Sequence, residues 1–106
     1  MQNIKTILIG IAFSQNLKPN LFEAVRLANL FEAELVGVHV GEKSKEKEIN
    51  LETLLAEADV LQKPLKTIWQ EGKPVDVIIE TCTKEKIDLL ILGAIQKENL
   101  FKYYVG

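Results

Sequence analysis

The stretch IKTILIGIAF, at residues 4–13, decides the fold class of this chain. Its large apolar side chains follow one another with almost no polar interruption, at Ile4, Ile7, Leu8, Ile9 and Ile11. A strand with one face in water would alternate apolar and polar residues, whereas a strand covered on both faces reads as a nearly continuous apolar run. The stretch therefore predicts an α/β fold, an open parallel sheet with helices on both faces.

Strand and helix patterns alternate along the remaining chain. The apolar residues of 21–31 recur at helical spacing, and Pro74 suits the first turn of a later helix. The predicted order is strand 4–13, helix 21–31, strand 35–40, helix 51–58, strand 65–69, a helix from Pro74 and strand 89–92. This alternation predicts one parallel sheet joined by right-handed crossovers.

Two expectations concern the helices. Residues 41–50, GEKSKEKEIN, carry three lysines and three glutamates without a hydrophobic face, which predicts a solvated connection. In the last predicted helix, Val75, Ile78, Ile79 and Cys82 are expected to share the buried face. The residues expected in the core are Ile9, Val25, Ala28 and Ile78.

Composition narrows the class of protein. With 106 residues, 47% hydrophobic and 26% charged, the chain suits a single globular domain. Its net charge of -2 favours neither nucleic acid nor an anionic membrane, and the longest apolar run, 7–13, is too short for membrane insertion. The single cysteine, Cys82, forms no internal disulfide, which is typical of a reducing compartment. We therefore expect a cytoplasmic location.

The residues of reactive type do not form a catalytic constellation. His39 stands alone near the end of a strand, which favours a hydrogen-bonded structural or crevice-lining role over a general base. Cys82 is expected to be a small buried hydrophobe and Trp69 a packing residue. One histidine and one cysteine far apart in the chain do not make a metal site. We therefore predict neither an enzyme nor a metalloprotein.

Three stretches together resemble the universal stress protein (UspA-like) family: TILIGIAFS at 6–14, AELVGVHV at 33–40, and GKPVDVIIETCTKEKIDLLILGA at 72–94. The resemblance covers almost the whole chain, and the third stretch is the most specific. It implies a Rossmann-like sheet of the adenine nucleotide alpha hydrolase type, with strand order 3-2-1-4. Residues 1–106 would then form a single domain that lacks the final helix and strand of the family. Strand 89–92 is accordingly expected to be an uncovered edge.

The family also implies a candidate nucleotide crevice. Its nucleotide binders carry a glycine, two residues, a second glycine, nine residues, then a third glycine with Ser or Thr. Here these positions are Gly93, Gln96 and Gly106, so the spacing is kept but the middle glycine is replaced. Ala12 stands where the binders usually have an aspartate after the first strand, and the backbone near Val40 completes the candidate site.

Physical reasoning places a crevice at the same position. In an open parallel sheet, ligands bind beyond the carboxyl ends of the strands where the winding direction reverses. With order 3-2-1-4 this point lies between the first and fourth strands. Residues 12–14 and 93–96 are expected to face each other across it.

The resemblance implies a regulatory or stress-response domain that acts as a homodimer or through a protein partner. The replacements at Ala12 and Gln96 predict weak or lost nucleotide binding and no cofactor. The alternative is an ATP or AMP sensor, attached to or regulating a membrane transporter, as some family members are.

Overall fold

The structure is a computed structural model that describes residues 3–58, 65–93 and 100–105. It is an α/β fold in which one five-stranded sheet has the order β3-β2-β1-β4-β5. The elements are β1 Thr6–Gly10, α1 Leu17–Phe31, β2 Glu34–Val40, α2 Lys45–Glu57, β3 Lys66–Gln70, α3 Pro74–Lys84, β4 Leu89–Gly93 and β5 Leu100–Tyr104. Within this described part, no helix has the length and apolarity needed to cross a membrane.

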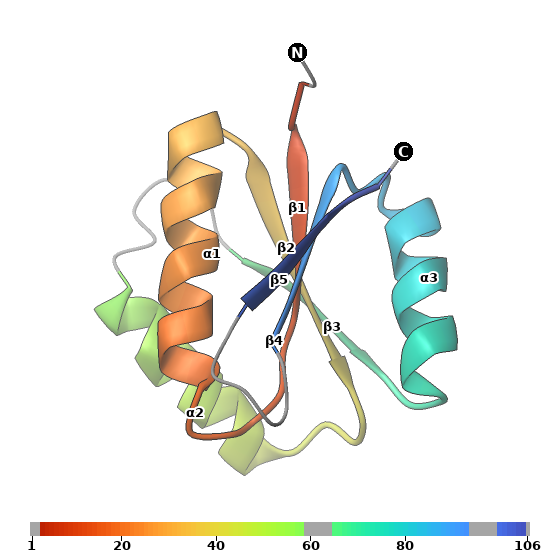
Figure 1. Cartoon of the computed structure of the whole chain (residues 1–106). Coiled ribbons are helices and arrows are strands. Elements are labelled where there is room, and N and C mark those ends of the chain that lie inside the picture. The colour runs from red at the N-terminus through yellow and green to blue at the C-terminus, as the bar shows by residue number, and fades with distance from the viewer. Residues whose placement is uncertain (1–2, 59–64, 94–99, 106) are drawn as a thin grey trace.

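The four strands β1 to β4 are parallel, as the sequence predicts. β1 pairs with β2 on one side and with β4 on the other, and β3 continues the sheet beyond β2. Helices α1 and α2 pack on one face of the sheet and α3 on the other (Figure 1). The predicted open sheet with order 3-2-1-4 and helices on both faces is confirmed.

The expectation that β4 is an uncovered edge is wrong. β5 pairs antiparallel with β4, from Leu89 opposite Tyr104 to Gly93 opposite Leu100. The backbone N–H of Val105 also donates a hydrogen bond to the carbonyl of Asp88 (2.9 Å). Because a short connection reverses the chain direction, it can join antiparallel strands but not parallel ones. The sheet therefore gains a fifth strand without a crossover helix in the described residues.

The core has one cluster on each face of the sheet. Alternate residues of β1 serve the two clusters, with Ile7 and Ile9 toward α1 and Leu8 toward α3. All three are buried, which is why the apolar run of this strand is continuous. Of the residues expected in the core, Ile9, Val25 and Ala28 are buried.

The predicted solvated connection over 41–50 is wrong for its second half, because α2 begins at Lys45. The hydroxyl oxygen of Ser44 caps the helix by accepting a hydrogen bond from the backbone N–H of Lys47 (3.2 Å). Glu46 and Glu48 lie in the first turn, where the helix dipole favours negative charge. Capping and dipole interactions thus start this helix before its apolar residues begin.

The predicted buried face of α3 is wrong in its rotation about the helix axis. Val75 and Ile79 are 68% and 60% exposed. Cys82 is buried as expected, whereas Val77 and Thr81 are buried in place of Val75 and Ile79. Ile78 is half-buried. Thr81 tolerates burial because its hydroxyl donates to the carbonyl of Val77 (2.7 Å) inside the helix.

Candidate functional site: a crevice at the switch between β1 and β4

A crevice of about 550 Å³ lies where the winding direction of the sheet reverses. Its walls come from the carboxyl ends of β1, β2 and β4 and from the beginnings of α1 and α3. In Figure 1 these ends of the parallel strands lie together at the bottom of the molecule. The volume falls in the range of small-molecule sites. The physical expectation for the position of the crevice is therefore met.

Three of the five predicted site residues line this crevice. Ala12, Val40 and Gly93 come from the ends of β1, β2 and β4, and the structure brings them together. Gln96 and Gly106 lie outside the described residues. The part of the glycine motif that the structure describes is therefore its first position.

Gly93 permits a close approach of α1. A Cβ atom at this position would lie 2.6 Å from Nδ2 of Asn20, a distance that real Cβ contacts essentially never show. Asn20 lies in the second turn of α1, and its side chain therefore reaches across the crevice to the end of β4. Because Nδ2 is the far end of a side chain that can turn aside, a larger residue at position 93 would displace the Asn20 amide rather than the backbone of α1.

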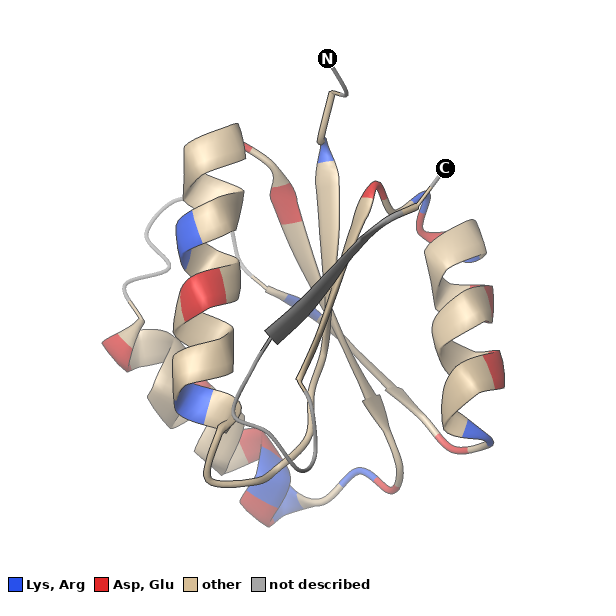
Figure 2. Ribbon diagram, viewed as in Figure 1, with Lys and Arg blue, Asp and Glu red and all other residues tan. Residues whose placement is uncertain are grey.

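The described lining of the crevice carries no charged side chain. Figure 2 shows charged residues on the helices and in the connections after β2 and β3, whereas the connection from β1 to α1 has none. The polar side chains of the lining are those of Ser14, Gln15, Asn16, Asn20 and His39. Sequence reasoning missed the three amides. Asn16 and Asn20 are four residues apart at the start of a helix after the first strand, a spacing that places both on one face.

His39 is buried and uses both of its ring nitrogens. Its Nδ1 lies 2.8 Å from the carbonyl oxygen of Ile11, and its Nε2 lies 3.2 Å from Nζ of Lys47. A carbonyl only accepts, so Nδ1 carries the proton and Nε2 accepts from the ammonium group. Edge contacts with Phe13 (4.9 Å between ring centroids) and Trp69 (5.5 Å) hold the ring. The structural, crevice-lining role predicted for His39 is confirmed.

The ring cluster closes one side of the crevice. Phe13 and Trp69 stack with their centroids 6.0 Å apart and an interplanar angle of 13°. Lys47 lies at the rim of this cluster, where its ammonium group also donates to the carbonyl of Glu42 (2.9 Å). The packing role predicted for Trp69 is confirmed.

Cys82 is not part of the crevice lining. It is a buried free thiol on α3, and the removal of its side chain from water raises its pKa. A raised pKa lowers the thiolate fraction at neutral pH and therefore the reactivity. Its predicted role as a small buried hydrophobe is confirmed.

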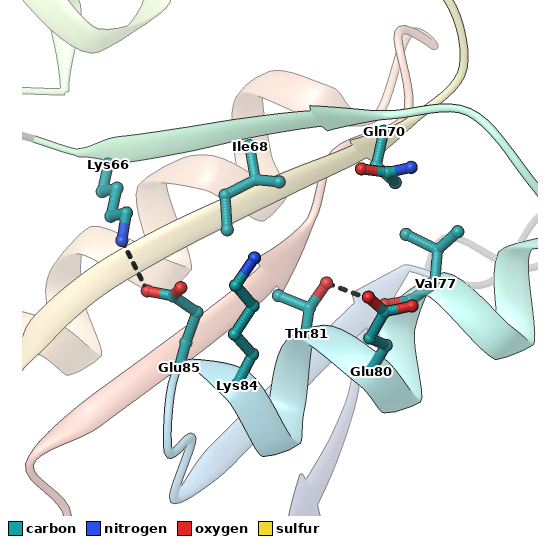
Figure 3. Close-up of a pocket in the computed structure, with 8 residues that line it drawn as sticks. All are labelled: Lys66, Ile68, Gln70, Val77, Glu80, Thr81, Lys84 and Glu85. Atoms are coloured by element: carbon teal, nitrogen blue, oxygen red, sulfur yellow. Dashed lines mark hydrogen bonds and ion pairs between the residues drawn. The ribbon is translucent and has the colours of Figure 1, made fainter.

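A second hollow, of about 250 Å³, lies between β3 and α3 (Figure 3). Lys66 and Glu85 form an ion pair of 2.7 Å at one end of it. Its lining mixes charges of both signs from Lys66, Glu80, Lys84 and Glu85. Because the Lys66 side chain is 62% exposed, this ion pair is largely screened by water.

Solved structures of other proteins match the fold of this chain. No protein-family model and no curated protein matches the sequence. A universal stress protein in complex with cAMP is 21% identical, with a TM-score of 0.74 over 89% of this chain and 75% of that chain. Universal stress protein UspA from Lactobacillus plantarum is 24% identical, with a TM-score of 0.63 over 89% of this chain and 79% of that chain.

One of the matching structures is a longer chain, and the match covers only part of it. A universal stress protein from Archaeoglobus fulgidus is 18% identical, with a TM-score of 0.69 over 85% of this chain and 33% of that chain. At these identities the likeness establishes the fold. This chain therefore has the fold of universal stress proteins.

Proposed function

We propose that this chain is a regulatory domain of the universal stress protein type, which acts by self-association or by binding a protein partner and holds nucleotides weakly or not at all. The observation that carries the proposal is the crevice at the β1–β4 switch, whose described lining has no charged side chain. A cytoplasmic location stays a prediction. So does the absence of a catalytic role.

The chemistry of the crevice argues against tight binding of a polyphosphate. Ala12 offers a methyl group where a carboxylate would accept hydrogen bonds from a nucleoside. In the described lining, the beginnings of α1 and α3 contribute the partial charges of helix N-termini, and such charges are worth about 0.3–1 kcal/mol at exposed sites. This is small beside the several charges of a triphosphate that must leave water.

Self-association is supported by an apolar pair on the outer side of α3. Val75 and Ile79 are one helical turn apart, and both are more than half exposed. Burying two such side chains against a second copy would contribute about 1.5–3 kcal/mol for each residue that becomes fully covered. The pair is too small to bind a partner alone, so we regard it as the centre of a larger contact.

Two measurements test the proposal. Isothermal titration of the complete domain with ATP and AMP should show no binding tighter than a Kd of about 100 μM. The double variant Ala12→Asp with Gln96→Gly should partly restore binding. In sedimentation, the domain should dimerise, and Ile79→Lys should shift it toward monomer. Leu30→Lys, on the outside of α1 where Leu30 is 65% exposed, is the matched control.

The second candidate function is an ATP or AMP sensor, alone or attached to a membrane transporter. It is favoured by one observation, the neighbour of the same fold that holds cAMP. A thermal-shift series with ATP, AMP and cAMP separates the two functions, because a ligand at a hundred times its Kd stabilises the fold by about 2.7 kcal/mol. A large shift with any of them would replace the first proposal with the second.

A further inference from the structure

We propose that His39 and Lys47 form a pH-sensitive contact: when the His39 ring takes up a second proton, the ammonium group of Lys47 leaves it, and the start of α2 is freed from the wall of the crevice. His39 is the single histidine of the chain. The pH-sensitive contact goes beyond the proposed function, since it concerns how the crevice is bounded and not what the crevice binds. It depends on the lone pair of one ring nitrogen, which a proton and Lys47 cannot both use.

The His39 ring is held so that one nitrogen faces Lys47. Its Nδ1–H donates to the carbonyl oxygen of Ile11 (2.8 Å). The rings of Phe13 and Trp69 contact it at angles of 79° and 70°, with centroids 4.9 and 5.5 Å away. The ring is buried, so it has little room to turn. A change at Nε2 must therefore be met by the group that faces this nitrogen.

Nε2 has one lone pair in the neutral ring, and Lys47 uses it. Nζ of Lys47 lies 3.2 Å from Nε2 and donates to it. An ammonium group only donates, so a second proton on the ring would leave two donors and two positive charges facing each other. Imidazole ordinarily changes its charge between about pH 5 and 8, whereas a lysine ammonium group stays charged there. The ring is therefore the partner that titrates, and a fall in pH removes the contact.

Lys47 is the partner that can move. It is half-buried, and its second hydrogen bond, to the carbonyl of Glu42 (2.9 Å), lies at an exposed position. Water there can hydrate the ammonium group and accept a hydrogen bond from the protonated ring. The backbone N–H of Lys47 also donates to the hydroxyl oxygen of Ser44, the cap of α2 (3.2 Å). Movement of Lys47 therefore loosens the first turn of the helix.

The charged residues next to the contact belong to the connection after β2 and to the first turn of α2: Glu42, Lys43, Lys45, Glu46 and Glu48. Lys43 and Glu48 form an ion pair with each other (3.5 Å). The β1–α1 connection and β3 contact the ring through Phe13 and Trp69, which carry no charge. Because carboxyl groups ordinarily titrate near about pH 4, the acidic residues stay charged over the range in which imidazole titrates.

NMR of the full chain at about pH 8 and about pH 5.5 tests the contact itself. Because the chain has a single histidine, its ring signals are unambiguous. At the higher pH, nuclear Overhauser effects should join the ε-methylene group of Lys47 to the ring of His39 and to that of Phe13, whose centroid is 6.0 Å from Nζ. At the lower pH these effects should be lost. His39→Gln keeps a donor and an acceptor but takes up no proton in this range, so its effects between Lys47 and Phe13 should be the same at both pH values.

The start of α2 is tested by amide hydrogen exchange at the same two pH values. The backbone amides of Lys47 and Glu48 donate to the hydroxyl and the carbonyl of Ser44. Their protection, each relative to its own intrinsic rate, should fall by about tenfold at the lower pH. Lys47→Met has no ammonium group to displace and should remove this response. Lys45→Met is the matched control, because Lys45 is exposed in the same turn, and it should keep the response.

Loss of the contact and of the protection with the same midpoint as ring protonation supports the proposal. If the ring protonates while the effects from Lys47 persist, the proton and Lys47 do not compete, and the proposal is wrong. It is also wrong if the ring stays neutral at about pH 5.5, or if Lys47→Met keeps the full fall in protection. Should a variant not fold, the unmodified chain decides, because different midpoints for the ring and for Lys47 contradict control by one proton.

Discussion

His39 illustrates how this fold accommodates a polar side chain in its interior. The ring is buried at the end of β2, between the carbonyl of Ile11 and the ammonium group of Lys47. Both nitrogens are thereby satisfied, so the cost of burying the ring is offset. Gly41 follows β2 directly and lies against the His39 ring, and its backbone has a φ of 151°.

Gly41→Ala should destabilise the domain. Its φ lies in the region that glycine adopts easily and other residues rarely do, and an added Cβ would lie 2.9 Å from Nε2 of His39. Strain of this kind costs on the order of 1–3 kcal/mol. Urea denaturation measures the loss, and a variant as stable as the original chain would refute the account of this turn.

Asp88→Ala should also lower the free energy of unfolding. Oδ2 of Asp88 accepts hydrogen bonds from the backbone N–H groups of Lys5 (2.8 Å) and Thr6 (3.0 Å) and so joins the beginnings of β1 and β4. Leaving those donors unpaired should cost about 1–3 kcal/mol. Asp88→Asn keeps an acceptor oxygen and serves as the control, with a smaller loss by thermal unfolding. Equal losses in the two variants would contradict this role.

At the scale of elements, α3 is a helix in which the side favoured by apolar spacing differs from the side that packs on the sheet. Five of its residues are valine, isoleucine or cysteine, at positions 75, 77, 78, 79 and 82. At about 100° per residue, positions 75, 78, 79 and 82 lie on one side of the helix and position 77 lies apart from them, so spacing alone favours a side that is in fact partly exposed. The side that carries Val77, Thr81 and Cys82 packs against β1, β2 and β4.

A pair of valines on α3 provides a matched test of this orientation. Val77→Ala should cost about 1.5–3 kcal/mol, because Val77 is buried and loses two methylene equivalents plus a cavity term. Val75→Ala should change stability by less than about 0.5 kcal/mol, since Val75 is exposed. Both values come from denaturant unfolding at a concentration where the chain is monomeric. If Val75→Ala lowers stability more than Val77→Ala does, the buried side of α3 is the one expected from apolar spacing, and this account of the helix is wrong.

At the scale of the whole molecule, β5 covers what would otherwise be the edge of the parallel sheet at β4. Parallel strands are buried on both faces, so β4 is apolar along its length. An apolar edge strand with unpaired backbone groups is a site of association. The antiparallel pairing of β5 protects this edge inside one chain.

Removal of residues 100–106 should therefore promote association through β4. The shortened chain should sediment as larger species at micromolar concentration and unfold at a lower temperature, because a ladder of backbone hydrogen bonds is lost. A chain that lacks only residue 106 is the control. If the shortened chain keeps the size distribution and melting temperature of the full chain, the protective role of β5 is wrong.

The buried first strand, the strand order and the position of the crevice could be predicted from the pattern of residues along the chain. The apolar run of residues 4–13 predicts a strand buried on both faces, and chain order with right-handed crossovers then predicts the parallel strand order 3-2-1-4. The position of the crevice follows from that order, and Ala12 and Gly93, which the order placed on opposite sides of it, both line it. Val40, expected from the family resemblance, lines it as well. The resemblance to universal stress proteins identified the same fold that the solved structures share.

Other features depend on contacts between segments far apart in the chain. The amide of Asn20 lies in the crevice because α1 packs close to Gly93, and nothing in the local sequence specifies that distance. The orientation of α3 depends on which of its sides fits the sheet, and Thr81 is buried because its hydroxyl bonds within the helix. The pairing of β5 with β4 depends on the free edge that the other strands leave. Packing and pairing of this kind are non-local, so they become visible only when the whole chain is folded.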